Sequence, residues 1–366
     1  MGLTLLLLAA LLAAGLMEGA WYRRALDKVA LRILVNGTRG KTTVTRLLAA
    51  ALNEAGIRAY ARTTGSQARL ITPDGGETDF RGGRLPNPME HKAFLRQAVK
   101  GGAQALVAEC MALRPENQAL LARRLVRPQY TVLTNALVDH EEEIGATKEQ
   151  TLRVLALSVM PGGTAVTGEA GFAPFVENVL PPAEGVGPEE LRGFCFPVHP
   201  ENVALALALT DRLGIPRETA LSGMRKARPD PGLLGGFYWE GRAFVNAFAA
   251  NDPDSFSRAM EETGQSGPYA LLYNHRRDRA PRLRAFARAV ARAPHPPACA
   301  FLIGDDPGQA AKYLARAGGL PAAPVRDLRA WAAGSEGPRL VLCAGNIKGD
   351  GMRLVERMRE EGRPCG

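Results

Sequence analysis

The 366-residue chain is poor in aromatic residues and in cysteines, and neither its glycines nor its prolines recur at a fixed period. Aromatic residues make up 6 %, and the 40 glycines and 26 prolines are scattered, which excludes collagen-like and low-complexity sequences. An odd number of distant cysteines without a CxxC pair excludes a disulfide framework and a zinc knuckle, and it favours a reducing compartment. The five cysteines are Cys110, Cys195, Cys299, Cys343 and Cys365.

The charge balance is basic, with 46 Lys and Arg against 37 Asp and Glu, which gives a formal net charge of +9. A basic chain suggests a nucleic-acid partner, but no basic helix with interleaved aromatic residues and no zinc-finger pattern accompanies the charge. We therefore predict no nucleic-acid partner. With 46 % hydrophobic and 23 % charged residues the chain is globular, and its length suggests two domains.

The first 17 residues carry no charge and consist mainly of leucine and alanine. This run crosses a bilayer if it extends to Trp21 and Tyr22, because about 20 residues are needed. A secretory signal peptide would carry its basic residues before the apolar run, and a buried core helix is the other alternative. We predict a single-pass membrane anchor over residues 1–22. Residues 23–366 are expected in the cytoplasm, because basic residues stay on that side and four of them follow the run, namely Arg23, Arg24, Lys28 and Arg32.

From residue 30 onward, short apolar runs alternate with longer amphipathic segments, which is typical of an α/β fold. Residues 42–55 and 202–213 are predicted helices. The Pro/Gly-rich segment 228–236 is the best candidate linker and divides the chain into domains over 23–228 and 229–366. Predicted strands are 31–35, 105–108, 130–133, 164–167, 243–245, 270–273, 300–303 and 340–342.

The strongest chemical motif lies directly between a predicted strand and a predicted helix and has the form G-T-x-G-K-T. Glycines let successive backbone N–H groups and the helix N-terminus point at phosphate oxygens. Lys41 is expected to neutralise the β- and γ-phosphates, and the Thr42 hydroxyl to bind Mg²⁺. Val35 stands where the longer form of this loop has glycine. The residues concerned are Asn36, Gly37, Thr38, Arg39, Gly40, Lys41, Thr42 and Thr43.

Further polar side chains follow the next predicted strands of the same domain. Glu109 follows strand 105–108, and Thr134 and Asn135 follow strand 130–133 and lead to Asp139 and His140. The carboxyl ends of parallel strands form the crevice in which open α/β sheets bind ligands. A carboxylate and an imidazole both suit a divalent cation, so these residues are candidate metal ligands.

Together these motifs resemble the central ATPase domain of the Mur ligase superfamily, and above all the membrane-anchored poly-γ-glutamate synthases of the PgsB/CapB type. The resemblance extends from the anchor to near the end of the chain. Its motifs are residues 35–41 (VNGTRGK), 62–65 (RTTG), 107–113 (VAECMAL), 199–202 (HPEN), 244–253 (FVNAFAANDP), 274–279 (NHRRDR) and 345–346 (GN).

The resemblance implies an N-terminal transmembrane helix, a Mur-ligase-like P-loop ATPase domain with a mostly parallel sheet and a smaller Rossmann-like α/β domain. It also implies an ATP- and Mg²⁺-dependent amide ligase. Such an enzyme activates the γ-carboxyl of a poly-γ-glutamate chain as an acyl-phosphate and adds glutamate, releasing ADP and phosphate. Membrane subunits that export the polymer are the implied partners. The chain departs from the wider superfamily in leaving no UDP-substrate domain ahead of residue 30, and Lys148 is not a convincing counterpart of the carbamylated lysine.

The resemblance also implies roles for single residues. Lys41 binds phosphate, Thr42 and Glu109 hold one Mg²⁺, and His140 holds a second cation or the γ-phosphate. Asn202 contacts adenine, and either Arg225 or Arg228 steadies the γ-phosphate. Asn251 and Asp252 lie where the second domain closes over the ribose, so Asp252→Ala is expected to weaken nucleotide binding and polymer synthesis.

A polyanionic substrate needs cations along its path. Arg62, Arg69, Arg81 and Arg84 cluster between the phosphate loop and Glu109, beside Thr63 and Thr64, although scattered solvated arginines would look the same. His275, Arg276 and Arg279 are a second candidate, because arginine suits bidentate recognition of carboxylates. Three alternatives to this function stay open: a folylpolyglutamate-type ligase, a membrane-tethered P-loop ATPase or kinase, and a non-catalytic assembly subunit.

Overall fold

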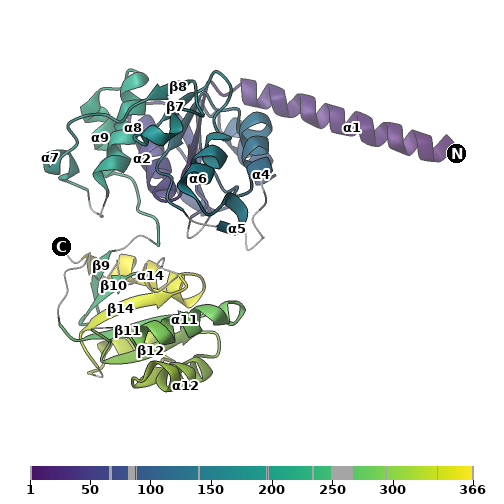
Figure 1. Ribbon diagram of the computed structural model, residues 1–366. Helices are drawn as coiled ribbons and strands as arrows, with labels where there is room; N and C mark the ends of the chain where they lie inside the picture. The colour runs from purple at the N-terminus through teal and green to yellow at the C-terminus, as the bar shows by residue number, and fades with distance from the viewer. Residues whose placement is uncertain are drawn as a thin grey trace. The chain divides into compact units, whose positions relative to one another are not determined.

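The computed structural model describes residues 2–65, 68–80, 87, 89–138, 141–194, 196, 198–232, 235–248, 267–293, 295–335 and 337–364. The chain divides into two compact units, Met1–Pro229 and Asp230–Gly366 (Figure 1). Six of the predicted site residues lie outside the described residues: Arg81, Arg84, Asp139, His140, Asn251 and Asp252.

An eight-stranded sheet forms the centre of unit 1. Its strand order is β4-β3-β2-β5-β1-β6-β7-β8, and all neighbours pair in parallel except β2 with β3 and β3 with β4. The strands are β1 (Leu31–Asn36), β2 (Ala59–Arg62), β3 (Arg69–Ile71), β4 (Glu77–Asp79), β5 (Ala105–Glu109), β6 (Tyr130–Leu133), β7 (Thr164–Val166) and β8 (Asn178–Leu180).

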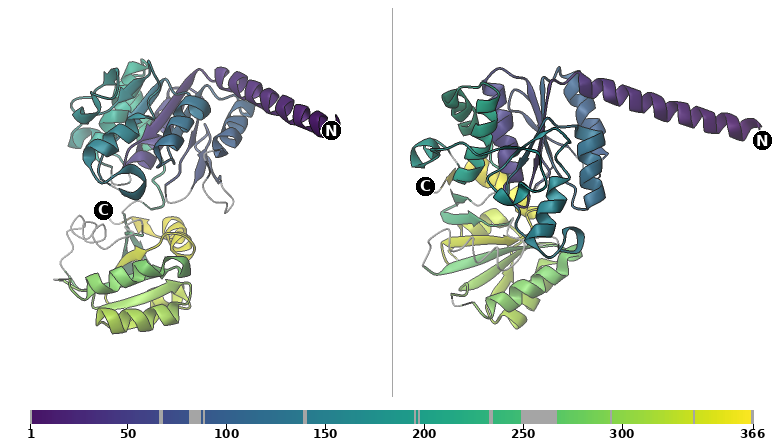
Figure 2. Two further views of the ribbon diagram at one scale, coloured as in Figure 1. Left: turned by 45° about the vertical axis from the view of Figure 1, so that its right-hand side comes forward. Right: turned by 45° about the horizontal axis from the view of Figure 1, so that its top comes forward.

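Helices cover both faces of this sheet, as Figure 2 shows. Successive β1 side chains alternate between the faces, so Ile33 and Val35 enter the core under α2 (Lys41–Glu54), α8 (Pro200–Arg212) and α9 (Arg217–Arg225). Leu34 enters the opposite core, under α3 (Glu90–Lys100) and η1 (Leu121–Val126). The other helices of unit 1 are α4 (Pro115–Leu120), α5 (Glu141–Ile144), α6 (Lys148–Ala156), η2 (Ala170–Phe172) and α7 (Pro188–Leu191).

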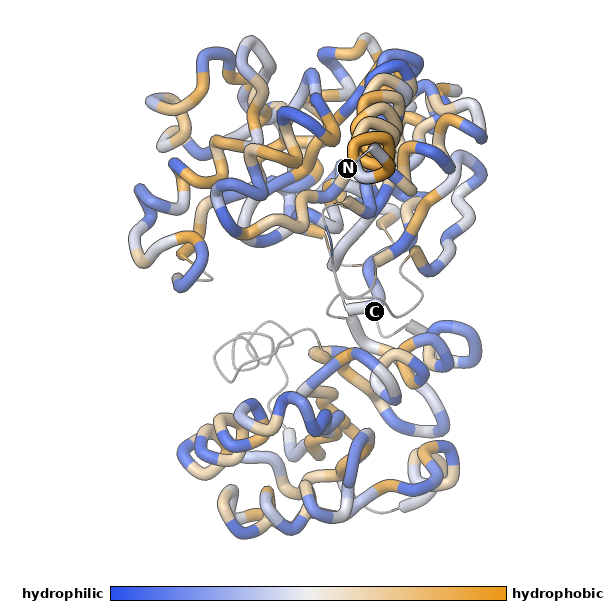
Figure 3. Tube along the Cα trace, turned by 90° about the vertical axis from the view of Figure 1, so that its right-hand side faces the viewer, coloured by the Kyte–Doolittle hydropathy of each residue, from blue (hydrophilic) through white to orange (hydrophobic). Residues whose placement is uncertain are grey.

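The N-terminal helix α1 (Gly2–Asp27) is long and apolar enough to cross a membrane, and its most apolar 18 residues are not buried in the protein. Figure 3 shows apolar colour on the sides of this helix along its outer part. A helix that is apolar all round is normally buried or inserted in lipid. The last turns of α1 are different, because Tyr22, Ala25 and Leu26 are buried in the same core as α3 and η1.

Unit 2 has a seven-stranded sheet of order β13-β12-β11-β14-β10-β9-β15, parallel apart from the pairings of β9 with β10 and β15. α11 (Ala280–Val290) and α12 (Pro307–Gly318) cover one face, and α13 (Leu328–Ala333) and α14 (Asp350–Glu361) cover the other. The remaining elements are β9 (Gly236–Trp239), β10 (Arg242–Asn246), β11 (Tyr269–His275), η3 (Arg277–Arg279), β12 (Cys299–Gly304), β13 (Ala322–Pro324), β14 (Leu340–Gly345) and β15 (Arg363–Pro364).

Each strand and helix predicted after residue 30 is present, with ends shifted by up to three residues, the largest shift being at the end of β14. The predicted helix 202–213 begins at Pro200, because proline is accommodated in the first turn, where its missing N–H would have no partner. Glu109 is the last residue of β5 instead of following it. Its carboxylate therefore projects from the strand itself, with the strand's fixed alternation.

Candidate active site

The phosphate loop joins β1 to α2, and two glycines in left-handed conformations shape it. Gly37 has φ +128° and Gly40 has φ +83°. A Cβ atom on Gly37 would lie 2.1 Å from Thr134 Oγ1, and one on Gly40 would lie 2.7 Å from Asn202 Oδ1. Both positions thus require glycine for conformation and for space. Gly40 is also the N-cap of α2, so the loop ends at the positive pole of a helix dipole.

Lys41 opens α2, and its side chain folds back over the loop. Its Nζ donates to Gly37 O at 2.6 Å and to Thr38 O at 3.2 Å. This places a fixed positive charge over the curled backbone, at the position where phosphate oxygens would gather.

Residues after β6 hold the loop from the side. Asn135 accepts from the backbone N–H of Thr38 (O, 3.2 Å) and of Arg39 (Oδ1, 3.0 Å), and its Nδ2 donates to Arg39 O at 3.2 Å. Thr134 Oγ1 donates to the same Arg39 carbonyl at 2.5 Å. The contacts of Asn135 are therefore with the loop backbone, and they hold the loop in its curled conformation.

The Glu109 carboxylate lies beside the loop and is 2 % exposed. The parallel pairing of β5 with β1 places Glu109 opposite Val35, which lies two residues before Gly37 of the loop. Its Oε2 accepts from Thr42 Oγ1 at 3.0 Å and from the backbone N–H of Thr64 at 2.7 Å. A hydroxyl and a carboxylate at hydrogen-bond distance are the oxygen ligands that Mg²⁺ prefers when it also binds substrate phosphates, so this pair fits a divalent cation. In the part of the chain that the structure describes, no group of three His, Cys, Asp or Glu residues converges on such a site.

Cys110 follows Glu109 directly and is buried. Burial raises the pKa of its thiol to about 11 against the smaller opposing effects of the Ala112 carbonyl contact and of Lys41. The thiol therefore stays protonated at neutral pH, which argues against a nucleophilic role beside the phosphate loop.

A cavity of about 470 Å³ adjoins the loop at Thr134. Gly168, Glu169 and Pro182 line it from one side, and Pro200 and Glu201, in the first turn of α8, line it from the other. Asn202 is the next residue and reaches Gly40. The predicted adenine contact is thus positioned between the phosphate loop and a cavity of a size that suits a small ligand.

The prediction that arginines near the phosphate loop line a path for a polyanionic substrate is wrong for Arg62. The Arg62 side chain is fully buried, pairs with Glu90 and has its guanidinium carbon 5.0 Å from the centre of the Phe80 ring. An arginine enclosed in this way cannot line a path for a polyanion, and its charge supports the fold next to Thr63 and Thr64 instead. Arg69 lies on β3, which β2 and β5 separate from β1, and it is half-buried.

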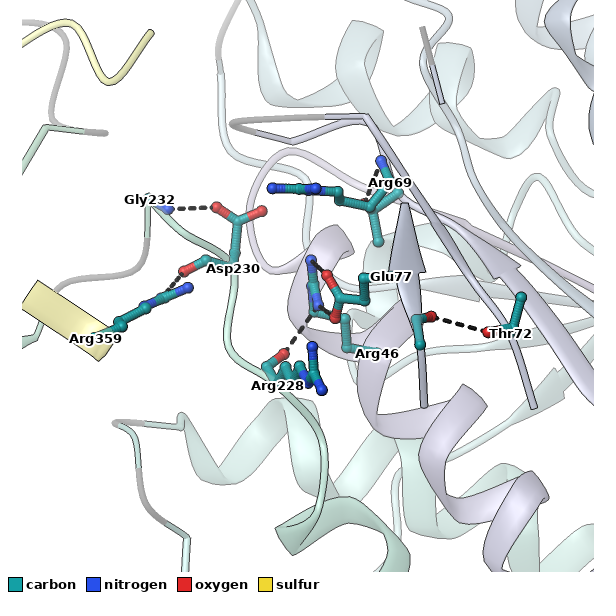
Figure 4. A network of polar contacts seen from close by, with 10 residues as sticks. Arg46, Arg69, Thr72, Glu77, Arg228, Asp230, Gly232 and Arg359 are labelled. Carbon is teal, nitrogen blue, oxygen red and sulfur yellow. Dashed lines mark hydrogen bonds and ion pairs between the residues drawn. The ribbon is translucent and has the colours of Figure 1, made fainter. Parts of the chain in front are cut away.

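Arg228 stands at the end of unit 1 and lies beside α2, as Figure 4 shows. Its carbonyl accepts from Arg46 Nη1 at 3.0 Å, and Arg46 is itself paired with Glu77 through both guanidinium nitrogens. These three residues line a cavity of about 330 Å³ together with Lys226. The backbone of Arg228 is therefore fixed to the helix that begins at the phosphate loop. Arg225, the other candidate, instead donates to Glu190 O at 3.3 Å.

In unit 2, polar residues gather where the parallel strands β11, β12 and β14 end. Asn274 Nδ2 donates to Asn346 O at 2.5 Å and to Lys348 O at 2.8 Å. Arg282 Nη1 donates to Asn346 Oδ1 at 2.7 Å. Asn274 Oδ1, Asn346 Nδ2 and His275 Nδ1 are buried and have no hydrogen-bond partner among the described residues. Buried polar atoms without partners are uncommon, and they mark this edge as a ligand-binding candidate.

Three residues at this edge are predicted substrate ligands, one neutral and two charged: His275, Arg276 and Arg279. Burial lowers the pKa of His275 against the opposing influence of Asp305 and Asp306, so the imidazole is neutral at pH 7. Arg276 Nη2 contacts Asp278 at 2.7 Å, and Arg279 Nε lies 3.9 Å from the same carboxylate. Arg282 was not predicted from the sequence, and Asn274 and Asn346 were named only as parts of motifs. Their positions at the ends of two predicted strands could have indicated that both asparagines lie at the ligand-binding edge of the sheet.

Comparisons with known proteins agree with this arrangement. Residues 35–154 match the model of the Mur ligase middle domain, and residues 238–361 match that of the poly-γ-glutamate synthase CapB C-terminal domain. The chain is 30 % identical to the PGA synthase CapB of Bacillus subtilis (strain 168) over 98 % of both chains. It belongs to the CapB family of poly-γ-glutamate synthases. The capsule biosynthesis protein CapB of Bacillus anthracis is also 30 % identical, over 96 % of this chain and 81 % of its own length.

Solved structures show the fold of this CapB family member. FolC of E. coli in complex with ADP has a TM-score of 0.69 at 17 % identity and covers 93 % of both chains. MurF of Acinetobacter baumannii has a TM-score of 0.65 at 17 % identity, over 93 % of this chain and 79 % of its own. The folylpolyglutamate synthase/dihydrofolate synthase of Yersinia pestis complexed with AMPPNP and Mn has a TM-score of 0.67. The predicted fold class and family are thereby confirmed.

Gly40 of the phosphate loop and Gly56, which follows α2, provide a matched test of the site. Gly40 and Gly56 have nearly the same φ, +83° and +79°, but a Cβ at Gly56 meets nothing within 4 Å. Both alanine variants are expected to lose about 1–2 kcal/mol of stability, the cost of a left-handed residue with a side chain, and Gly40→Ala is expected to lose more because its Cβ meets Asn202. Only Gly40→Ala also displaces Asn202, so only this variant is expected to weaken binding of a fluorescent ATP analogue. Equal affinities of the two variants would remove Asn202 from the nucleotide site.

Proposed function

We propose that this chain is the ATP-dependent ligase that extends poly-γ-glutamate at the membrane, one glutamate at a time. The observation that supports it most directly is the phosphate loop with Lys41 over it and the Thr42–Glu109 pair beside it. Family membership supplies the product, since the B. subtilis relative is named a PGA synthase. The enzyme is thus an ATP-dependent amide ligase that uses ATP, a divalent metal and glutamate, and we propose Mg²⁺ as the metal.

The chemistry follows from the poor reactivity of a carboxylate toward amines. An oxygen of the terminal γ-carboxylate attacks the γ-phosphorus of ATP, ADP departs, and an acyl-phosphate remains. The amine of the incoming glutamate attacks its carbonyl carbon, and phosphate departs as the amide forms. Lys41 and the N-terminus of α2 stabilise the negative charge that develops on the transferring phosphoryl group. A divalent ion held by Thr42 and Glu109 would neutralise further phosphate charge.

Recognition of the substrate carboxylates is assigned to arginines. Arg69 on β3, and Arg276 and Arg279 at the carboxyl edge of the unit 2 sheet, are the arginines we assign to this role, because a guanidinium group pairs with a carboxylate in a bidentate manner. His275, which is neutral, is assigned a hydrogen bond and not a charge.

Product analysis separates this function from its alternatives. The full chain in membranes, given ATP, Mg²⁺, labelled glutamate and an oligo-γ-glutamate acceptor, is expected to release one ADP and one phosphate for each glutamate incorporated. An ATPase or kinase would consume ATP without glutamate, and a folylpolyglutamate-type ligase would require a folate acceptor. ATP consumption that is independent of glutamate would refute the proposal.

The membrane location is part of the same proposal. We assign α1 as the single-pass anchor, with residues 23–366 in the cytoplasm and with membrane subunits of an export complex as partners. The support is the exposed apolar outer part of α1 and the basic residues that follow it.

Two truncations test the anchor. Removal of residues 2–17 is expected to release the protein into the soluble fraction when about 1 M salt screens the remaining basic residues. Its unfolding temperature is expected to stay unchanged, because residues 2–17 are exposed. Removal of residues 2–27 also deletes Tyr22, whose hydroxyl donates to Leu125 O at 2.5 Å, and Leu26, which is buried. This variant is expected to lose several kcal/mol of stability, since burying one leucine alone contributes about 2 kcal/mol. Sedimentation of both variants with membranes would contradict the assignment.

A further inference from the structure

The helix α1 does not end where its apolar run ends but continues into the core of unit 1. Gly19 and Ala20 are half-buried, and Tyr22, Ala25 and Leu26 pack in the same core as Phe94 and Leu95 of α3. The apolar run that we assign to the membrane and the last turns that pack in unit 1 belong to one uninterrupted helix. The helix thus fixes which face of unit 1 lies against the bilayer, and this face includes α3.

Two basic side chains of α3 reach the level at which α1 leaves the protein. Lys92 Nζ lies 2.9 Å from Glu18 Oε1, and Arg96 Nη2 lies 3.9 Å from the same oxygen. The guanidinium carbon of Arg96 lies 5.0 Å from the centre of the Trp21 ring. Two cations therefore face one carboxylate, which leaves a net positive charge beside the helix.

Arg23 and Arg24 of α1 add to this charge, and both are exposed. With Lys92 and Arg96 they form what we call the basic collar. At 1.5 Å per residue, positions 18–24 span only about 9 Å along the helix axis. The polar headgroup layer of one leaflet is of similar depth, about 5–8 Å. Trp21, at the same level, is a residue type that is enriched in this layer.

We propose that the basic collar binds the headgroups of anionic phospholipids, so that the membrane holds unit 1 by its α3 face as well as by the inserted helix. The inference rests on the proposed anchor and adds to it a binding surface of stated chemistry. Charge complementarity selects this occupant, because phosphate-bearing headgroups with net negative charge accumulate at the cytoplasmic surface and attract Lys and Arg. Half of the collar comes from a helix some 70 residues away from the anchor in sequence, so the sequence run alone does not show it.

The test uses the full chain in detergent, titrated with phosphatidylglycerol or phosphatidylcholine, and counts the bound lipids by native mass spectrometry. Preferential binding of phosphatidylglycerol that weakens with added salt is expected. The double variant Lys92→Ala/Arg96→Ala is expected to lose about fivefold in affinity per side chain, on the order of twenty-five-fold in all. The matched control is Lys312→Ala/Arg316→Ala, an exposed basic pair at the same spacing on α12. The control is expected to bind as the wild type does.

A single variant that is expected to increase lipid binding controls for loss of folding, because an unfolded protein would not bind more lipid. Glu18→Gln frees Lys92 and Arg96 from their carboxylate and is expected to strengthen the binding of phosphatidylglycerol. Unchanged binding in the Lys92→Ala/Arg96→Ala and Glu18→Gln variants, or equal binding of both lipids by the wild type, would overturn the proposal and favour a protein partner for this surface. Failure of the anchor itself is distinguishable, because the full chain would then stay in the supernatant with vesicles of phosphatidylcholine, to which the basic collar is not expected to bind.

Discussion

Lys41→Ala is expected to abolish polymer synthesis while the protein stays folded. The Lys41 ammonium is fixed over the loop by the carbonyls of Gly37 and Thr38, so it is in place before the phosphoryl group moves. Removal of one such preorganised charge typically costs a hundredfold to a thousandfold in rate. The two hydrogen bonds that are lost are partly buried, and one such bond contributes about 1 kcal/mol, so the variant is expected to unfold at a moderately lower temperature but to stay folded.

The measurement is ADP released per unit time in the presence of glutamate and acceptor. Lys312→Ala, an exposed lysine of unit 2, is the control and is expected to keep the full rate. A Lys41→Ala protein that keeps more than about a tenth of the rate would have lost less than roughly 1.4 kcal/mol of transition-state stabilisation. Such a small loss would refute the assignment of the loop as the phosphate site.

The phosphate loop could be predicted from the sequence because its determinants are local. Glycines at 37 and 40, a lysine at 41 and a threonine at 42 act within one strand–loop–helix connection. The periodicity of apolar residues located the main strands for the same reason. Short-range sequence patterns were therefore sufficient to predict the phosphate loop that follows β1.

The partners of this loop could be predicted only in part, because they depend on register between distant strands. That Glu109 lies opposite Val35 follows from the pairing of β5 with β1, and that Thr64 N–H reaches Glu109 follows from the turn after β2. The sequence indicated Glu109 as a ligand but not its contact with Thr64.

The prediction for Arg62 was wrong for an instructive reason. A charge count cannot tell a solvated arginine from one enclosed by a partner, and Arg62 is enclosed by Glu90 and Phe80, which come 28 and 18 positions later in the chain. The Asn274–Asn346 contact in unit 2 likewise joins the ends of β11 and β14, 72 residues apart. Both features arise from tertiary packing that local patterns do not encode.

Glu109→Gln is expected to raise the concentration of divalent metal required for activity by at least tenfold, with the fold intact. The amide keeps the size of the side chain and an oxygen that can accept from Thr42 Oγ1 and from Thr64 N–H, two contacts that join Glu109 to the site. What it removes is the negative charge, and Mg²⁺ is bound chiefly through carboxylates and substrate phosphates.

A readout other than activity isolates the metal. Binding of Mn²⁺ in the presence of ADP, followed by electron paramagnetic resonance, is expected to weaken in Glu109→Gln and to stay unchanged in Glu218→Gln, an exposed glutamate on α9. Loss of activity alone could arise from a shifted loop. Weakened metal binding with an unchanged unfolding temperature could not, because the hydrogen bonds that set the loop are preserved. Identical Mn²⁺ affinities for Glu109→Gln and the wild type would exclude Glu109 as a direct ligand and assign it to fixing the Thr64 backbone beside the phosphate loop.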